Sequence, residues 1–243
     1  MVGEGQSSDD ARDAIPDVAV ERAVEAYRAH LPRLDSFRSA FEALVRSLLD
    51  SEGVKVQHVE SRCKNVQGYR EKVRRKSYAD PDSEMTDVVG VRVIVYYQDH
   101  VGKAAALFER EFDVDTANSS GQRVPSSHGE FGYRSYHLVI SLDKRRGALP
   151  EWQAHASQKV ELQIRSVLDH AWAEVEHELF YERSRAGREP EPRLWRRFKG
   201  LMADLERVDD GFIETRDRIE EAEVIRSDDA QEAPARSAKG HNE

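Results

Sequence analysis

The stretch KVELQIRS, Lys159 to Ser166, alternates apolar and polar residues with the period of an extended chain. The apolar residues fall on one side, where a sheet core would bury them: Val160, Leu162 and Ile164. The polar residues fall on the other side, as an acid, an amide and a guanidinium group: Glu161, Gln163 and Arg165. This row is either the solvated face of an ordinary strand or the floor of a functional site.

Strand and helix patterns around this stretch indicate the fold class. Further strands are expected at residues 54–60, 91–97 and 133–142, which alternate in polarity or are rich in β-branched and aromatic residues. Amphipathic helices are expected at residues 34–51, 65–76, 99–112 and 166–182, with a shorter helix before a break at Pro32. This order predicts an α+β fold, a mixed or mostly antiparallel β-sheet flanked by helices.

The C-terminal part is predicted to form a long helix from Leu194 to about Val224. Its apolar residues recur at steps of four and three: Leu194, Phe198, Leu201, Leu205, Val208 and Phe212. Such a seam fits a partner helix, either within the chain or in another copy of it. The expected organisation is a disordered N-terminus at 1–14, a folded domain at 15–190, a helical extension at 191–225 and a disordered tail at 226–243.

The composition is that of a soluble chain with enough apolar residues for a core. Of the 243 residues, 39% are apolar and 34% are charged. No run approaches the roughly 18 apolar residues of a membrane helix, and the acidic start of the chain lacks the apolar centre of a secretory signal. Cys63 is the only cysteine, which excludes an internal disulfide and is typical of the reducing cytosol. A cytoplasmic protein with no membrane partner is therefore expected.

Charge is distributed unevenly along the chain. The net charge of −9 argues against a general polyanion binder. The segment from Lys55 to Ser77 nevertheless carries eight Lys and Arg residues against two Glu. A local basic segment in an acidic protein suggests a confined anionic ligand such as the phosphates of a nucleotide. A solvated helix face accounts for the same charges.

Polar residues on three of the expected strands could form one site. Asp87 comes just before the strand that holds Arg92, and Tyr133, Ser135 and His137 share a face of the next long strand. If these faces coincide with that of Glu161 on one sheet, two carboxylates and several cations would meet. Two carboxylates on neighbouring strands are a common way to hold Mg²⁺ against a nucleoside triphosphate, because hard cations prefer oxygen ligands.

Five motifs occur in a recognisable order: SRCKNVQGYREKV, TDVVGVRVIVYYQD, FGYRSYH, VELQIRS and HAWAEVEHELFYE. Together, over residues 34–182, they resemble the synthetase domain of the RelA/SpoT-like alarmone enzymes, especially the small single-domain alarmone synthetases. The resemblance implies a nucleotidyltransferase-like mixed sheet. It also implies a pyrophosphokinase that moves the β,γ-pyrophosphate of ATP onto the 3′-hydroxyl of GDP or GTP, giving (p)ppGpp and AMP.

The resemblance also implies a role for each matching residue. Three cationic residues would bind ATP and its phosphates, and a fourth would support the phosphate site: Arg62, Lys64 and Lys72, with Arg92. Asp87 and Glu161 would hold Mg²⁺, and Glu161 would accept the proton of the 3′-hydroxyl. The acceptor side would comprise a stacking ring, a histidine near the phosphates and the rest of the polar floor: Tyr133, His137, Gln163 and Arg165.

The sequence departs from the family pattern at positions that bind anions. Gly68 replaces a usual serine, Glu182 replaces a lysine, and the loop before Tyr133 has only Arg123 where the family has lysines. A guanine nucleotide is the leading acceptor because Tyr133 is retained. The alternative is a toxic synthetase, with an antitoxin partner, that modifies adenine nucleotides or the 3′ end of tRNA. A second alternative is a nucleotide-binding sensor without catalysis.

One cluster on the helix at residues 166–182 has two interpretations. His170, Glu174, His177 and Tyr181 recur at steps of four, three and four, so they share a helix face. Two histidines and a glutamate can bind zinc, although this spacing is not that of the HExxH motif. Hydrogen bonds that fix the helix on the sheet, or on a bound nucleotide, are the simpler interpretation.

Overall fold

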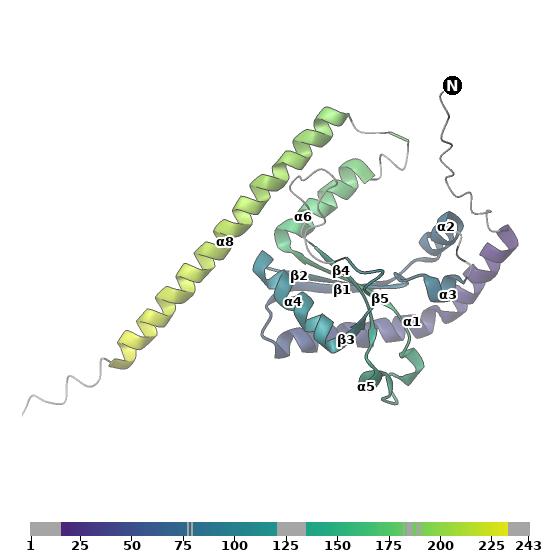
Figure 1. Ribbon diagram of the computed structural model, residues 1–243, viewed down its shortest axis with the longest axis horizontal. Coiled ribbons are helices and arrows are strands. Elements are labelled where there is room, and N and C mark those ends of the chain that lie inside the picture. Colours follow the sequence, from purple (N-terminus) through teal and green to yellow (C-terminus); the bar gives the residue numbers. More distant parts are fainter. Residues whose placement is uncertain are drawn as a thin grey trace, which may run out of the picture.

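A computed structural model describes residues 16–76, 78, 80–120, 135–181, 183, 187–188 and 191–232. Its centre is one five-stranded sheet in the order β1 (Val56–Cys63), β2 (Val89–Val95), β5 (Val160–Ser166), β4 (Tyr136–Leu142) and β3 (Phe112–Val114). Strands β2 and β5 run parallel, and the other neighbouring strands run antiparallel. The prediction of an α+β fold with a mixed sheet flanked by helices is therefore confirmed (Figure 1).

Apolar residues on one face of the sheet form the core. Helices α1 (Asp17–Ser51) and α4 (Gln98–Glu111) pack against this face. The alternation of β2 and β5 turns a set of fully buried side chains toward them: Val89, Val91, Val93, Val160, Leu162 and Ile164. The polar residues between these positions consequently point to the opposite face of the sheet.

Helix α1 runs through Pro32 without a break, so the prediction of two short helices was wrong. Proline removes one backbone hydrogen bond and costs about 3 kcal/mol inside a helix. Buried side chains lie on both sides of Pro32, including Val24, Tyr27, Phe37 and Phe41. Their burial at about 1.5–3 kcal/mol each outweighs the cost of the proline.

Shorter elements complete the domain. Helices α2 (Val66–Lys76), α3 (Pro81–Glu84) and α5 (Lys144–Gly147) and the 3₁₀ turn η1 (Gln153–His155) lie in the connections. Helix α6 (Val167–Glu176) follows β5 directly and continues into the π-helical turn η2 (His177–Tyr181). It begins where the Ser166 hydroxyl accepts a hydrogen bond from the backbone N–H of Asp169 at 3.1 Å.

Helix α8 (Pro192–Glu232) lies beside the domain and extends beyond it (Figure 1). Its first part buries Phe198 and Met202 against Trp172 of α6, and Arg216 reaches α4 further along. The helix ends later than predicted, because residues 226–232 are helical rather than disordered. Residues 1–14 and 233–243, which were also predicted to be disordered, lie outside the described residues. No helix within the described ranges has the length and apolar character needed to cross a bilayer.

Candidate active site

The polar faces of three strands meet in rows across the open side of the sheet. In the first row, Arg62 of β1 pairs with Gly90 of β2, and Gly90 pairs with Glu161 of β5. A Cβ atom on Gly90 would lie 3.9 Å from both the Arg62 Cγ and the Glu161 carbonyl oxygen. Because Gly90 has no side chain, the space between the arginine and the glutamate stays open for a ligand.

The second row lies one step further along the strands. It joins Glu60 of β1, Arg92 of β2, Gln163 of β5 and His137 of β4 through successive backbone pairs. This register explains how residues from distant parts of the sequence share one surface. The predicted coincidence of the polar faces is therefore present for these strands. Tyr133, the predicted stacking residue, lies outside the described residues.

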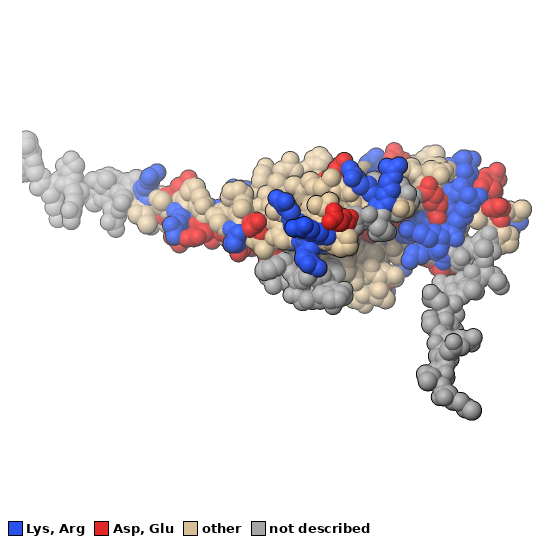
Figure 2. All heavy atoms as spheres, turned by 90° about the horizontal axis from the view of Figure 1, so that it is seen from above, with Lys and Arg blue, Asp and Glu red and all other residues tan. Residues whose placement is uncertain are grey.

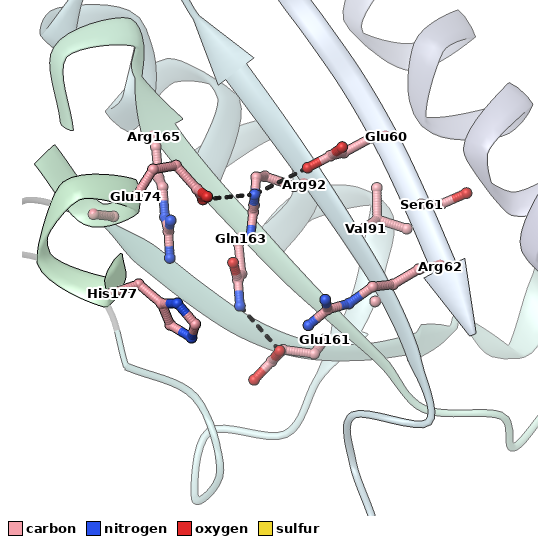
Figure 3. Close-up of a pocket in the computed structure, with 12 residues that line it drawn as sticks. Glu60, Ser61, Arg62, Val91, Arg92, Glu161, Gln163, Arg165, Glu174 and His177 are labelled. Carbon is pink, nitrogen blue, oxygen red and sulfur yellow. Dashed lines mark hydrogen bonds and ion pairs between the residues drawn. The ribbon is translucent and has the colours of Figure 1, made fainter. Parts of the chain in front are cut away.

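Apart from His137, the residues of these rows form the floor of a cavity of about 540 Å³. Ala173 and Glu174 of α6 and His177 of η2 close one side of it (Figure 3). Five of the predicted site residues extend into the cavity from the sheet: Arg62, Arg92, Glu161, Gln163 and Arg165. The polar row of the stretch 159–166 is thus the floor of a cavity and not a flat solvated face.

Glu161 and Gln163 are linked within this floor. The Gln163 Nε2 donates a hydrogen bond of 3.1 Å to the Glu161 Oε2. The Gln163 Oε1 is buried and has no hydrogen-bond partner among the described residues. A buried acceptor without a partner is costly, so a bound ligand that donates to this oxygen would stabilise the site.

Arg92 is held by two carboxylates that the sequence analysis did not assign to the site. Its Nη1 donates to the Glu60 Oε1 at 3.0 Å and to the Glu174 Oε1 at 3.2 Å (Figure 3). Glu60 and Arg62 are two residues apart on β1, so their side chains lie on the same face of the sheet. This alternation is the sequence signal that could have revealed Glu60 as a site residue. These contacts fix the guanidinium group at the boundary between the sheet and α6.

Asp87, two residues before the start of β2, forms a separate ion cluster with two lysines. The Lys64 Nζ lies 2.8 Å and the Lys72 Nζ 2.9 Å from the Asp87 Oδ2. Burial raises the pKa of this carboxyl, but the two ammonium groups outweigh burial and leave its pKa below the ordinary value. The second oxygen, Oδ1, is buried with no hydrogen-bond partner among the described residues.

Asp87 and Glu161 offer carboxylate oxygens to a cation from different places, because Asp87 is not among the residues that line the cavity holding Glu161. Asp87 lies three residues before Gly90, the neighbour of Glu161 across the parallel pair. The described residues contain no cluster of three or more His, Cys, Asp or Glu side chains that could hold a metal, so the zinc alternative on α6 has no support there. The Asp87 Oδ1 and the Glu161 carboxylate suit Mg²⁺, which takes one or two protein carboxylates and completes its shell with phosphates and water.

His137 lies beside Gln163 on β4, as the strand pairing requires. Burial lowers the pKa of His137, Glu161 acts in the opposite direction, and Arg165 and Arg92 lower the pKa further. A neutral imidazole can accept or donate one hydrogen bond toward a ligand but adds no positive charge.

Lys and Arg side chains gather at the end of the molecule that carries α2 (Figure 2). Several of them already have partners on the protein: Arg70 pairs with Glu21, and Arg74 pairs with Asp17. Arg62 is exposed and makes no ion pair with another described residue. The cation closest in register to Glu161 is therefore available to an anionic ligand.

A family model described as "Region found in RelA / SpoT proteins" matches residues 61–186. The chain belongs to the RelA/SpoT family. The matched region contains β2, β4 and β5 and the last three residues of β1, Ser61 to Cys63. The resemblance stated from the motifs is therefore confirmed, and the synthetase-type domain is that of the small alarmone synthetases.

Two relatives in Bacillus subtilis (strain 168) support this membership. GTP pyrophosphokinase YjbM is 30% identical over 200 residues, which cover 77% of this chain and 89% of that protein. GTP pyrophosphokinase YwaC is 26% identical over 132 residues, or 52% of this chain and 59% of that protein.

Solved structures agree with the fold. A GTP pyrophosphokinase family protein from Streptococcus pneumoniae superimposes with a TM-score of 0.60 at 23% identity, covering 83% of this chain and 97% of that one. The small alarmone synthetase 1 from Bacillus subtilis, bound to its product pppGpp, gives a TM-score of 0.53 at 26% identity, with 82% and 97% covered.

Proposed function

We propose that this chain is a pyrophosphokinase that transfers the β,γ-pyrophosphate of ATP to the 3′-hydroxyl of GDP or GTP, producing (p)ppGpp and AMP. The observation that carries the proposal is the position of Glu161 on a cavity floor that also holds Arg62, Arg92 and Arg165. A carboxylate among guanidinium groups can take a proton while the cations screen a pyrophosphate. The names of the two Bacillus relatives support the same reaction.

In the proposed reaction these residues act in a single displacement at the β-phosphorus of ATP. The acceptor 3′-oxygen attacks the β-phosphorus of ATP, and its proton passes to Glu161. The bond between the β-phosphorus and the oxygen that bridges to the α-phosphate breaks, and AMP leaves with that oxygen. Arg62 and Arg92 would bind the oxygens over which negative charge spreads, which is how most catalysis of phosphoryl transfer arises.

Asp87 and Glu161 would together hold the Mg²⁺ that such a reaction uses. The buried, unpartnered Oδ1 of Asp87 is the feature of this chain that fits a cation. When bound, Mg²⁺ neutralises charge on the β- and γ-phosphates. Lys64 and Lys72 now share the other oxygen of Asp87, and a cation on that carboxylate would release their ammonium groups to the phosphates.

The acceptor has a second candidate because the cavity is not strongly basic. Three acidic residues, Glu60, Glu161 and Glu174, line it together with the three arginines. A nucleotide with several 5′-phosphates favours a site with excess positive charge. The balanced charge favours, as the alternative acceptor, the 3′ end of a tRNA, which a toxic synthetase with a neighbouring antitoxin would modify. An adenine nucleotide is the other acceptor of this alternative and differs from a guanine nucleotide in its base and not in its phosphate charge. A non-catalytic sensor is the third candidate.

The deciding experiment supplies ATP labelled at the γ-phosphate, Mg²⁺ and one acceptor at a time. The acceptors are GDP, GTP, adenine nucleotides and tRNA. Label on GDP or GTP supports the proposal, whereas label only on adenine nucleotides or tRNA selects the alternative. Nucleotide binding without transfer to any acceptor overturns the enzyme proposal and favours the sensor.

Two further features bear on the location and the assembly of the protein. We place the reaction in the cytoplasm, where ATP and GTP are available and where the lone thiol of Cys63 stays reduced. We also propose that the chain self-associates through α8, because several of its large apolar side chains remain exposed.

A further inference from the structure

Two tyrosines that the proposed reaction does not use are buried beside the Asp87 cluster, which consists of this carboxylate with Lys64 and Lys72. Tyr27 of α1 is 2% exposed, and Tyr69 of α2 is fully buried. Their rings stack with the centroids 4.1 Å apart and the planes 3° from parallel. Stacked aromatic pairs stabilise a contact beyond the area that they bury. The pair therefore fastens the first half of α1 to α2 (Figure 1).

The Tyr27 hydroxyl group holds the segment that carries Lys64. It donates a hydrogen bond of 2.5 Å to the backbone carbonyl of Lys64. Burial raises the pKa of Tyr27 well above its ordinary value, with smaller contributions from Cys63 and Asp87, so the hydroxyl keeps its proton and acts as a donor. The backbone N–H of Lys64 donates in turn to the carbonyl of Val88 at 2.8 Å. Both backbone groups of Lys64 are thus bound, one to α1 and the other to the residue that follows Asp87.

Tyr69 has the corresponding place for Lys72. The two residues lie on the same helix, α2, and the Tyr69 ring ties this helix to α1. The Tyr69 hydroxyl donates to the Asp82 Oδ1 of α3 at 3.3 Å. Helix α3 ends three residues before Asp87. The helix that carries Lys72 is therefore bound both to α1 and to the segment that leads into Asp87.

The geometry of the Asp87 cluster depends on where these segments lie. The Lys64 and Lys72 ammonium groups share the Asp87 Oδ2, at 2.8 and 2.9 Å. Like charges that close repel each other, so the shared contact needs backbones that stay in place. A lysine side chain is long and flexible, and fixing its backbone limits the positions that the ammonium group can reach. The tyrosine pair supplies this constraint for both lysines.

Packing alone does not account for a tyrosine at position 27. A phenylalanine would fill the same space and would stack on Tyr69 in the same way. A buried hydroxyl group costs stability unless it forms a hydrogen bond, and the Tyr27 hydroxyl forms its bond with the main chain of Lys64. This bond is the feature that a packing role leaves unexplained.

We propose that Tyr27 and Tyr69 are positioning residues for ATP that act through Lys64 and Lys72. They hold the two backbone segments in place while the ammonium groups pass from Asp87 to the phosphates of ATP. Holding the segments before ATP arrives reduces the cost of ordering the lysines when it binds. Because the two lysines bind phosphates only in the proposed function, the inference rests on that function.

The first test measures binding of a non-hydrolysable ATP analogue with Mg²⁺ by calorimetry. Tyr27→Phe keeps the ring and removes the hydroxyl, so the dissociation constant should rise about three- to tenfold. The matched control is Phe108→Leu, which alters a fully buried ring of α4, well apart from α2 in Figure 1. This control should lower the melting temperature and change the dissociation constant by less than about twofold. Equal dissociation constants for Tyr27→Phe and the wild type would overturn the proposal.

The second test asks whether Tyr27 acts through Lys64. Lys64→Met keeps the length of the side chain and removes the ammonium group. If Tyr27 positions this group, adding Tyr27→Phe to Lys64→Met should weaken analogue binding by less than about 1.5-fold. Additive losses in the double variant would refute the coupling, since a general loosening of the fold weakens binding in either background.

The third test separates the stack from the hydroxyl at Tyr69. Tyr69→Leu loses the stacked ring and should weaken analogue binding at least about tenfold, whereas Tyr69→Phe keeps the ring and should stay within about twofold of the wild type. Equal binding by these two variants would remove Tyr69 from the proposal. All three tests read binding and not transfer. A wild type that binds the analogue but transfers no pyrophosphate would therefore remove the proposed reaction and leave this inference standing.

Discussion

Glu161 is the residue on which the proposed chemistry depends most directly. Replacing it with glutamine keeps the shape and the contact with Gln163 but removes the proton acceptor. Because general base catalysis contributes about 10²–10⁴-fold, Glu161→Gln should lower pyrophosphate transfer by at least about 100-fold. ATP binding, measured by calorimetry with a non-hydrolysable analogue in the absence of Mg²⁺, should change by less than about twofold, since the cationic side chains remain.

The matched control is Glu178→Gln, which removes an exposed carboxylate of η2 that does not line the cavity. This variant should transfer pyrophosphate at the wild-type rate. Equal losses of transfer and of ATP binding in Glu161→Gln would contradict the role of Glu161 as the base, because they would indicate a structural or purely binding role.

His137 should make the stability of the fold depend on pH. Its folded pKa lies below the unfolded value of about 6.5, with burial as the main cause. As the pH falls through about 6.5, the unfolded chain binds a proton that the folded chain does not, so this residue lowers the free energy of unfolding in acid. Above that pH both states are neutral and the effect vanishes.

Urea unfolding of His137→Gln between pH 5 and 7.5 measures this contribution. The variant should show a shallower loss of stability on acidification, differing from the wild type by at most about 1.4 kcal/mol per pH unit. His58→Gln, which replaces an exposed histidine of β1, is the comparison variant. Identical slopes for His137→Gln and the wild type would show that burial does not perturb this histidine.

The sequence revealed part of the site at the residue scale. Period-two alternation was enough to place Glu161, Gln163 and Arg165 on one face, and the register confirms it. Glu60 and Glu174 were missed as partners of Arg92 because their contacts depend on how β1 and α6 lie relative to β2. Such distances are set by tertiary packing and have no local signature.

At the scale of elements, Gly90 shows how β2 keeps the site open. Gly90→Val should fill the gap between Arg62 and Glu161, where even a Cβ would be in van der Waals contact with both. Valine favours strands by up to about 1 kcal/mol over glycine, so the melting temperature should stay the same or rise. Transfer activity should fall by at least about tenfold, because the branched side chain occupies ligand space.

Gly90→Ala is the graded control, and its activity should lie between those of the wild type and the valine variant. The measurement is a thermal melt together with the labelled-ATP assay. Full activity in Gly90→Val would mean that substrates do not approach the sheet between these two strands.

Helix α1 shows where element prediction from sequence fails. The proline rule was applied locally, and it predicted a break at Pro32. The actual helix passes through it because the same apolar stripe continues on both sides, with Tyr27 and Phe37 both buried. The end of α8 was predicted too early. Residues 226–232 have few apolar side chains, so the sequence predicts disorder there, but the helix continues to Glu232 without them.

At the scale of the whole molecule, Arg216 connects α8 to the domain. Its guanidinium group makes two contacts with the Asp99 carboxylate, at 3.0 and 3.2 Å, and lies 4.6 Å from the centroid of the Tyr97 ring. Arg216→Met should therefore lower the free energy of unfolding by about 1–3 kcal/mol. Amide hydrogen exchange in the C-terminal half of α8 should become faster.

Arg226→Met removes an exposed arginine of the same helix and serves as the comparison for Arg216→Met. It should leave both the stability and the exchange rates unchanged. Unaltered exchange in Arg216→Met would show that the far half of α8 is held by something other than its contact with α4.

The strand order could not have been obtained from the sequence patterns. These patterns located four of the five strands, but nothing in them stated that β2 pairs with β5 or that this pair is parallel. The short edge strand β3 was not predicted, because its three residues are too few to show an alternation of apolar and polar side chains; Phe112 is the last residue of the predicted helix.

The parallel pair also determines when the protein becomes competent during its synthesis. About 65 residues separate the end of β2 from the start of β5. A ribosome adding roughly 5–20 residues per second would expose the cationic segment and β2 several seconds before Glu161. During that interval a nascent chain has phosphate-binding groups but lacks Glu161, so each new copy should stay inert until β5 has emerged and inserted between β2 and β4.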